Sequence, residues 1–135
     1  ARALADAGVP AHAVDFVSSH GTGTPFNDQM EARALQLVFG DLVRHLPVNS
    51  IKGAVGHTLG AAGLLEAVMA VQVMAAQRIP ATVGLGEPDP ACALDLVMGS
   101  PRVAEVRCVL STALGFGGEN AAVVFASAAE RGELL

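Results

Sequence analysis

The chain has 135 residues, enough for one domain with a single hydrophobic core. Hydrophobic residues make up 52% and charged residues 16%, which suits a compact α/β unit, or a piece of something larger whose faces pack against a partner. The net charge of −5 and the scattered arginines argue against a nucleic-acid-binding protein, because phosphate binding needs clustered Lys and Arg.

The first half of the chain predicts two helices around a short strand. Residues 1–7 look like the end of a helix, because Gly8 and Pro10 follow them. Residues 14–17 predict a buried strand. The next helix is expected to begin near Pro25, with Asp28 as its N-cap and Glu31 at capping-box spacing, and to end at Gly40.

The second half predicts a strand, a long helix and a closing run of strands. After the strand at 47–51 we expect a glycine-rich loop through His57 and a helix over 59–77, followed by an ordered loop over 79–90. Strands are then predicted over 94–97, 103–110 and 121–125, the last two joined by a glycine-rich hairpin turn. This order indicates a layered α/β fold with a mixed sheet.

The location of the protein is inferred from what the sequence lacks. Residues 59–76 are mostly apolar, but they contain Glu66 and Gln72, and a spanning helix needs about 20 apolar residues with few charges. We therefore expect a buried helix and no membrane partner. The N-terminus resembles no signal peptide, and the absence of a starting Met suggests a cut or processed chain. The two cysteines form no CxxC motif or disulfide framework, so a reduced, cytoplasmic protein is expected.

Two histidines stand where a strand is expected to give way to a loop. His20 opens the run HGTGT (20–24), and His57 closes KGAVGH (52–57), which contains Lys52, the only lysine of the chain. Two imidazoles that donate N–H hydrogen bonds to one oxygen would stabilise an enolate or oxyanion. Lys52, with Glu31 as its candidate partner, could set the charge and tautomer of the pair. The plainer alternatives are structural histidines in glycine turns and a solvated surface lysine.

A third glycine-rich loop, GFGG at 115–118, could bring a backbone N–H and the mobile ring of Phe116 over the same cleft. Taken alone, this run indicates only a hairpin turn.

The three motifs, in this order and with Thr58-Leu59-Gly60-Ala61-Ala62-Gly63 after His57, resemble the C-terminal part of a β-ketoacyl-acyl-carrier-protein synthase of the thiolase superfamily. The resemblance runs from about residue 3 to residue 126. The run after Thr24 is more similar to discrete fatty-acid or type II polyketide synthases than to modules of giant synthases. The implied fold is the C-terminal half of a thiolase-like αβαβα layered fold with a mixed five-stranded sheet, here lacking its first strand, so that residues 1–135 form a partial domain.

The resemblance implies a decarboxylative Claisen condensation and a role for each matching residue. His20 and His57 would assist decarboxylation of malonyl thioester and stabilise the enolate, with Lys52 and Glu31 as the charged pair behind them. Phe116 would be the gatekeeper beside Gly117. The hydroxyls of Thr22 and Thr24 would bind the phosphopantetheine arm of the acyl carrier protein. Because that arm carries the substrates, no separate cofactor and no metal are expected.

The nucleophilic cysteine of the family is not evident in this chain. Cys92 and Cys108 lack its strand-to-helix context, and both are expected to be buried small hydrophobes. His12 and His45 belong to no motif and should lie on the surface. The cysteine would therefore come from an N-terminal ketosynthase half, and this chain alone is expected to be inactive.

Three hypotheses follow for the chain as a whole. The first is the C-terminal segment of a condensing enzyme that works with its N-terminal complement, with acyl carrier protein, and as a homodimer or a heterodimer with a subunit similar to a chain-length factor. The second is an inactive ketosynthase-like fragment that serves as a binding or scaffold subunit. The third is an independent α/β domain whose glycine motifs are only turns. We favour the first, because a scaffold has no need of His20, Lys52, His57 and Phe116.

Overall fold

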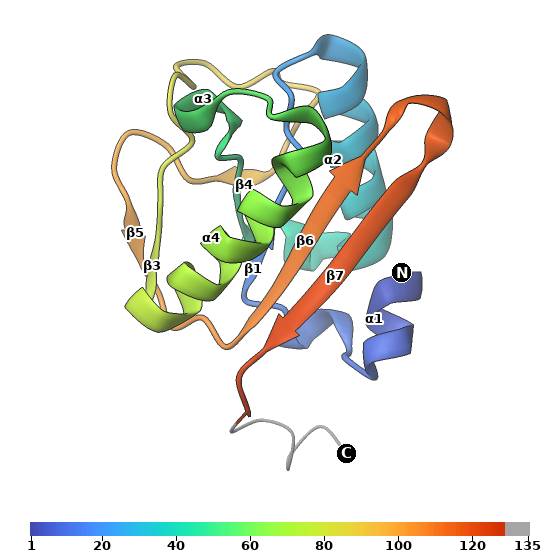
Figure 1. Cartoon of the computed structure of the whole chain (residues 1–135), viewed down its shortest axis with the longest axis vertical. Coiled ribbons are helices and arrows are strands. Elements are labelled where there is room, and N and C mark those ends of the chain that lie inside the picture. Colours follow the sequence, from blue (N-terminus) through green and yellow to red (C-terminus); the bar gives the residue numbers. More distant parts are fainter. Residues whose placement is uncertain (129–135) are drawn as a thin grey trace.

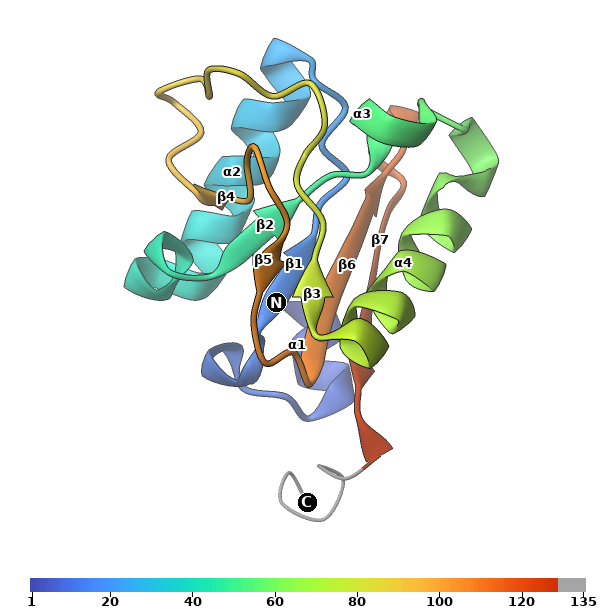
Figure 2. The ribbon, with the colours of Figure 1, turned by 90° about the vertical axis from the view of Figure 1, so that its left-hand side faces the viewer.

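The computed structural model describes residues 1–128 and has three layers, a central sheet between helices (Figures 1 and 2). Figure 2 shows helix α2 on one side of the sheet and helix α4 on the other. The elements are α1 (Arg2–Ala7), β1 (Phe16–Ser18), α2 (Pro25–Phe39), β2 (Pro47–Asn49), α3 (Lys52–Val55), α4 (Ala62–Ala76), β3 (Arg78–Ile79), β4 (Asp95–Leu96), β5 (Arg102–Val103), β6 (Cys108–Leu114) and β7 (Asn120–Ala126), with short 3₁₀ helices at Ala11–Ala13, Gly40–Arg44, Leu59–Ala61 and Phe116–Gly118.

The main sheet has five strands in the order β4-β2-β1-β6-β7. The pairs β4–β2, β2–β1 and β1–β6 are parallel, whereas β7 runs antiparallel to β6. The predicted α/β fold with a mixed five-stranded sheet is therefore confirmed. Strand β7 is at one end of this order, so its outer edge has no strand neighbour within residues 1–128. That a further first strand belongs beside this sheet stays a prediction.

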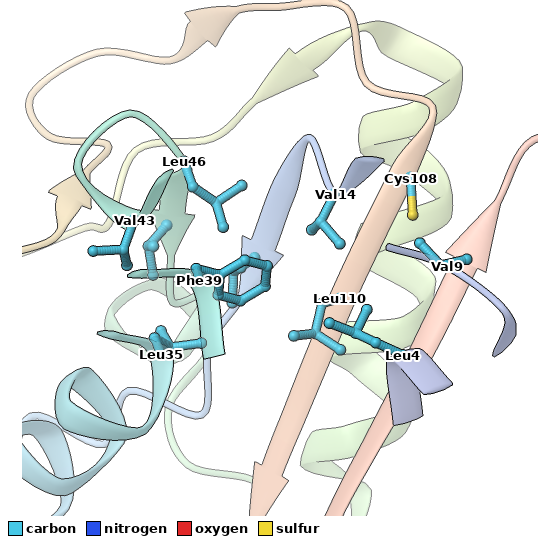
Figure 3. Close-up of a cluster of buried hydrophobic side chains, with 11 residues drawn as sticks. Leu4, Val9, Val14, Leu35, Phe39, Val43, Leu46, Cys108 and Leu110 are labelled. Carbon is cyan, nitrogen blue, oxygen red and sulfur yellow. The ribbon is translucent and has the colours of Figure 1, made fainter. Parts of the chain in front are cut away.

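Each face of the sheet packs on its own hydrophobic cluster. Alternate residues of a strand point to opposite faces, so Phe16 and Val17 of β1, both 0% exposed, belong to different clusters. Val17 packs with Leu35 and Phe39 of α2 in the cluster drawn in Figure 3. Phe16 packs in the other cluster, with Ala70 and Val73 of α4. A strand buried on both faces is typical of a parallel sheet covered by helices.

Helix α2 begins at Pro25, as predicted, but its N-cap residue differs from the prediction. Proline is favoured in the first helical turn, where its missing N–H is not needed, and Pro25 takes that place after Thr24 as N-cap. The prediction of Asp28 as N-cap is therefore wrong. Asp28 lies one turn into the helix and accepts a hydrogen bond from Gly23 N–H at 3.2 Å.

Several predicted boundaries also differ. The expected loop after β2 contains the one-turn helix α3, and the predicted helix over 59–77 begins as a 3₁₀ turn in which Leu59 has a φ of +53°. The predicted strand at 103–110 is two strands, because β5 pairs antiparallel with β3 in a separate small sheet while β6 joins the main one. Short apolar runs do not reveal which partner strand they will pair with.

Helix α4 is buried on one face only, which corrects the prediction of a buried helix. Ala62, Glu66, Ala70 and Val73, spaced by three or four residues, face the sheet and are buried. The opposite face exposes Leu64 at 69%, with further apolar side chains at Leu65, Val68 and Val71. Within residues 1–128, the segment 59–76 is the one stretch whose length and composition would suit a membrane span.

Candidate active site

The three glycine-rich motifs come together at one end of the sheet. They follow β1, β2 and β6, which are parallel, so their carboxyl ends lie at the same edge (upper end of Figure 1). Strand β1 lies between β2 and β6. The next strand in the chain, β2, pairs with one edge of β1, and the later strand β6 pairs with its other edge. In open α/β sheets, ligands bind outside the carboxyl ends of the strands at such a switch point.

His20 and His57 are neighbours at this edge. Their ring centroids lie 5.4 Å apart and the rings are inclined by 82°, an edge-to-face arrangement. His20 is 5% exposed, whereas His57 is exposed. His57 Nδ1 accepts a hydrogen bond from Leu59 N–H at 3.2 Å, so the neutral ring carries its proton on Nε2. The two histidines that the sequence predicted as a pair are therefore in contact in the structure.

The ring of His20 is placed through its backbone. Its N–H donates to Glu31 Oε1 at 2.8 Å, and its carbonyl oxygen accepts from Lys52 Nζ at 2.5 Å. Within the described part of the chain, the buried ring atom Nδ1 has no hydrogen-bond partner. The backbone that carries the ring is therefore held by two buried side chains, one on either side of it.

Burial keeps His20 neutral. Desolvation lowers its pKa from 6.5 to about 4, and the charge of Lys52 and the presence of His57 act in the same direction. Asp28 opposes the shift. At neutral pH the imidazole is uncharged and can donate one N–H hydrogen bond without carrying a positive charge into the site.

Lys52 forms its ion pair with Glu66 of helix α4, not with Glu31 as predicted. The side chains of Lys52 and Glu66 are 6% and 1% exposed, and the two groups are in direct contact. Burial raises the pKa of the Glu66 carboxyl, which Lys52 opposes. Sequence reasoning noted Glu66 only as a charge in an apolar helix. A carboxylate on the buried side of an apolar helix needs an oppositely charged partner, and this need was the feature of the sequence that pointed to an ion pair with Lys52.

Glu31 has a different role from the one predicted. It is 5% exposed, and its two carboxylate oxygens accept from three donors: the N–H groups of His20 and Gly21, each at 2.8 Å, and the hydroxyl of Thr112 at 2.7 Å. Gly21 has a φ of +42°, and a Cβ there would lie 2.6 Å from Ser50 Cβ. Glu31 therefore holds the turn that only glycine can make. Thr112, on β6, was not predicted as a site residue.

The two threonines of the first motif lie at its exposed end. Their hydroxyls, Thr22 Oγ1 and Thr24 Oγ1, are 2.9 Å apart and form a hydrogen bond. Both can turn toward a ligand, because a hydroxyl can donate and accept. That they bind a phosphopantetheine arm stays a prediction.

The third motif forms the predicted hairpin turn between β6 and β7. Gly115 N–H donates to the carbonyl oxygen of Glu119 at 2.8 Å, and Gly117 and Gly118 have positive φ values of 78° and 86°. The side chain of Phe116 is 98% exposed, so it packs on neither histidine in this structure. Its gatekeeper role and the part assigned to Gly117 remain predictions.

A cavity of about 340 Å³ lies between the first turns of α2, the one-turn helix α3 and the loop over 82–92. Lys52, His57, Glu31 and Thr22 line it. The loop approaches so closely that a Cβ on Gly53 would lie 1.9 Å from the carbonyl oxygen of Val83. This part of the cavity wall therefore requires glycine at position 53, because a side chain there would meet the backbone of Val83.

Cys92 and Cys108 are the two cysteines of the chain. Both are buried, as predicted. Burial raises the pKa of Cys92, and the nearby carboxylates of Asp89, Asp28 and Glu31 raise it further, so its thiol stays protonated. His12 and His45 are exposed, as predicted. Residues 1–128 contain no group of three or more His, Cys, Asp or Glu side chains arranged to hold a metal ion.

Comparison with known proteins gives one consistent family. The family model described as "Beta-ketoacyl synthase, C-terminal domain" matches residues 1–86. A 3-oxoacyl-[acyl-carrier-protein] synthase 2 from Coxiella burnetii is 43% identical over 121 residues, which cover 90% of this chain and 29% of that protein.

Two solved structures have the same fold and moderate sequence identity. The ishigamide ketosynthase/chain length factor matches with a TM-score of 0.88 and 37% identity over 92% of this chain and 30% of that chain. A ketosynthase of a type II polyketide synthase, solved with its acyl carrier protein and bound to the hexaketide, matches with a TM-score of 0.90 and 31% identity over 93% and 31%. The chain thus spans about 30% of the length of these relatives.

Proposed function

The chain belongs to the β-ketoacyl synthase family as its C-terminal domain, and from this we propose that it supplies the two active-site histidines of a β-ketoacyl-acyl-carrier-protein synthase. The observation that carries the proposal is the contact of His20 with His57 at the carboxyl edge of the sheet, with the ring centroids 5.4 Å apart. Two imidazoles held this close can donate two N–H hydrogen bonds to one oxygen.

The chemistry follows from that pair. Cleavage of the bond between the malonyl carboxylate and its α-carbon releases carbon dioxide and leaves an enolate, whose negative oxygen accepts from the two imidazoles. The enolate carbon attacks the carbonyl carbon of an acyl thioester on a cysteine, a new carbon–carbon bond forms, and the cysteine thiolate leaves. A histidine that stays neutral, as burial keeps His20, provides a donor without protonating the enolate.

The nucleophilic cysteine would come from an N-terminal ketosynthase half, so the 135-residue chain alone would be inactive. The protonated, buried Cys92 supports this assignment. The exposed apolar face of α4 also supports it, since Leu64 is 69% and Val68 52% exposed and a covering half would bury them. The relatives, of which this chain spans about 30%, have the length for such a half.

The other partners are proposed from the neighbours. One neighbour is a ketosynthase with its acyl carrier protein and another is a ketosynthase/chain length factor, so an acyl carrier protein and a homodimeric or heterodimeric ketosynthase partner are assigned here. Malonyl and acyl groups would arrive on the phosphopantetheine arm, which Thr22 and Thr24 would bind. Phe116 and Gly117 would close over the arm once it is in place.

The test compares the chain alone with the same chain joined to, or coexpressed with, an N-terminal ketosynthase half. We expect no substrate-derived acyl thioester on Cys92 or Cys108 of the chain alone by peptide mass spectrometry. The assembled protein should decarboxylate malonyl carrier protein and form the β-ketoacyl product. An acyl thioester on either cysteine of the chain alone would overturn the assignment of the nucleophile. No decarboxylation by the assembled protein would overturn the proposed function.

A further inference from the structure

The ring of His20 has an unusual support. Its buried Nδ1 has no hydrogen-bond partner among residues 1–128, so no side chain at that atom fixes the ring. The backbone is fixed instead, by Lys52 at the carbonyl oxygen and by Glu31 at the N–H. Whatever holds Glu31 in place therefore holds the imidazole as well.

Among residues 1–128, Thr112 is the one side chain of the sheet that donates a hydrogen bond to the Glu31 carboxylate. Thr112 donates its hydroxyl hydrogen to Glu31 Oε1 at 2.7 Å, the same oxygen that accepts from His20 N–H. Thr112 Oγ1 also lies 3.3 Å from the His20 nitrogen as a second acceptor for that N–H. The side chain is only partly buried, but the carboxylate that it contacts is 5% exposed.

Thr112 has a position from which it can link two motifs. It lies on β6, which is parallel to β1, and it comes one position after Ser111, the register partner of Ser18. Four residues after Thr112, the same strand leads into the loop that carries Phe116. A shift of β6 would therefore reach the backbone of His20 through Thr112 and Glu31.

We propose that Thr112 is a positioning residue of the candidate active site: its hydroxyl aligns Glu31 with the amides of His20 and Gly21 and so sets the His20 ring against His57. The proposal rests on the proposed function for its kinetic consequence but not for its structural one. A hydrogen bond from a hydroxyl to a carboxylate is among the stronger hydrogen bonds of a protein. A small displacement of a catalytic group costs much of its effect.

The experiment uses the assembled synthase, that is, the chain together with its N-terminal half, and two matched variants. Thr112→Val removes the hydroxyl at nearly constant shape, whereas Thr112→Ser keeps the hydroxyl and removes the methyl group. We expect Thr112→Val to lower kcat for malonyl decarboxylation roughly 10- to 100-fold with KM within about twofold, and Thr112→Ser to remain within about threefold of the unsubstituted enzyme. Acyl transfer to the cysteine should not change in either variant.

A double-mutant cycle tests whether Thr112 acts through Glu31. In the Glu31→Gln background, Thr112→Val should have an effect of less than about threefold, because the carboxylate that it aligns is absent. Equal effects in both backgrounds, a normal kcat for Thr112→Val, or a loss shared equally by Thr112→Ser would overturn the proposal. So would a change in KM alone.

Crystal structures of the unsubstituted protein and both variants separate this inference from the proposed function. In Thr112→Val the distance between the His20 and His57 ring centroids should depart from 5.4 Å, and in Thr112→Ser it should stay. An unsubstituted synthase without decarboxylase activity would refute the proposed function, while these structures would still decide the positioning role. If Thr112→Val fails to fold, the Thr112→Ala variant is used for the same comparison.

Discussion

Lys52 and Glu66 form a buried ion pair, and Lys52 also donates to the carbonyl oxygen of His20 at 2.5 Å. One ammonium group thus joins helix α4 to the turn after β1. Since the side chains are 6% and 1% exposed, neither charge can be solvated if its partner is removed.

Breaking this pair should destabilise the assembled protein strongly. We expect Lys52→Met to lower the free energy of unfolding by about 3–5 kcal/mol, because it leaves the Glu66 carboxyl buried without its partner. The double variant Lys52→Met, Glu66→Leu should recover most of that loss in urea unfolding. Equal stability of Lys52→Met and the unsubstituted protein would show that the pair is not buried in solution.

The histidine pair should be required for decarboxylation but not for acyl transfer. We expect His20→Ala and His57→Ala each to lower malonyl decarboxylation by about 10²–10³, the usual cost of losing an oxyanion donor. Transfer of an acyl group to the cysteine is the control, measured by intact mass. Variants that decarboxylate at the normal rate would contradict the roles given to both residues.

The lowered pKa of His20 predicts how stability changes with pH. In the unfolded chain His20 takes up its proton near pH 6.5, but in the folded protein only near pH 4. Below pH 6.5 the unfolded state therefore binds more protons, so the contribution of neutral His20 is complete above pH 6.5 and is lost as the pH falls toward 4. The His20→Asn variant should lose less stability than the unsubstituted protein between pH 7 and pH 4.5, measured by urea unfolding. Parallel curves would refute the shift.

The close approach of the cavity loop should make Gly53 irreplaceable. A Cβ at this position would lie 1.9 Å from the Val83 carbonyl oxygen, so Gly53→Ala must displace backbone. We expect a loss of about 1–3 kcal/mol or more in thermal or urea unfolding. Gly86→Ala, in the same loop but with open space around its Cα, is the control and should be nearly neutral.

The proposed N-terminal half should cover helix α4 and leave α2 exposed. Helices α4 and α2 lie on opposite sides of the sheet, and Leu64 of α4 and Leu37 of α2 are 69% and 71% exposed in this chain. In the assembled synthase Leu64→Gln should cost about 2–3 kcal/mol, the value of a buried leucine, whereas Leu37→Gln should change stability little. Equal, small effects would show that the partner does not lie on α4.

The local features of this chain were open to prediction because neighbouring residues decide them. Gly8 ended α1 in a left-handed conformation, with a φ of 67°, and the hairpin formed at the glycine run before β7. The two histidines fell at one edge because both follow parallel strands of the predicted α/β fold. The family could also be recognised from short sequence motifs, because recognising a motif requires no knowledge of tertiary contacts.

Tertiary structure decided the partners of the charged groups. Glu66 forms an ion pair with Lys52, 14 residues away in the sequence, and Glu31 accepts a hydrogen bond from Thr112, 81 residues away. Such pairings depend on which strands are neighbours in the sheet and on which helix covers each face, and local periodicity contains neither. In the low dielectric of the core, an ionised group must take whichever partner the packing brings within reach, so the charges of this site could be recognised in the sequence but matched only in the fold.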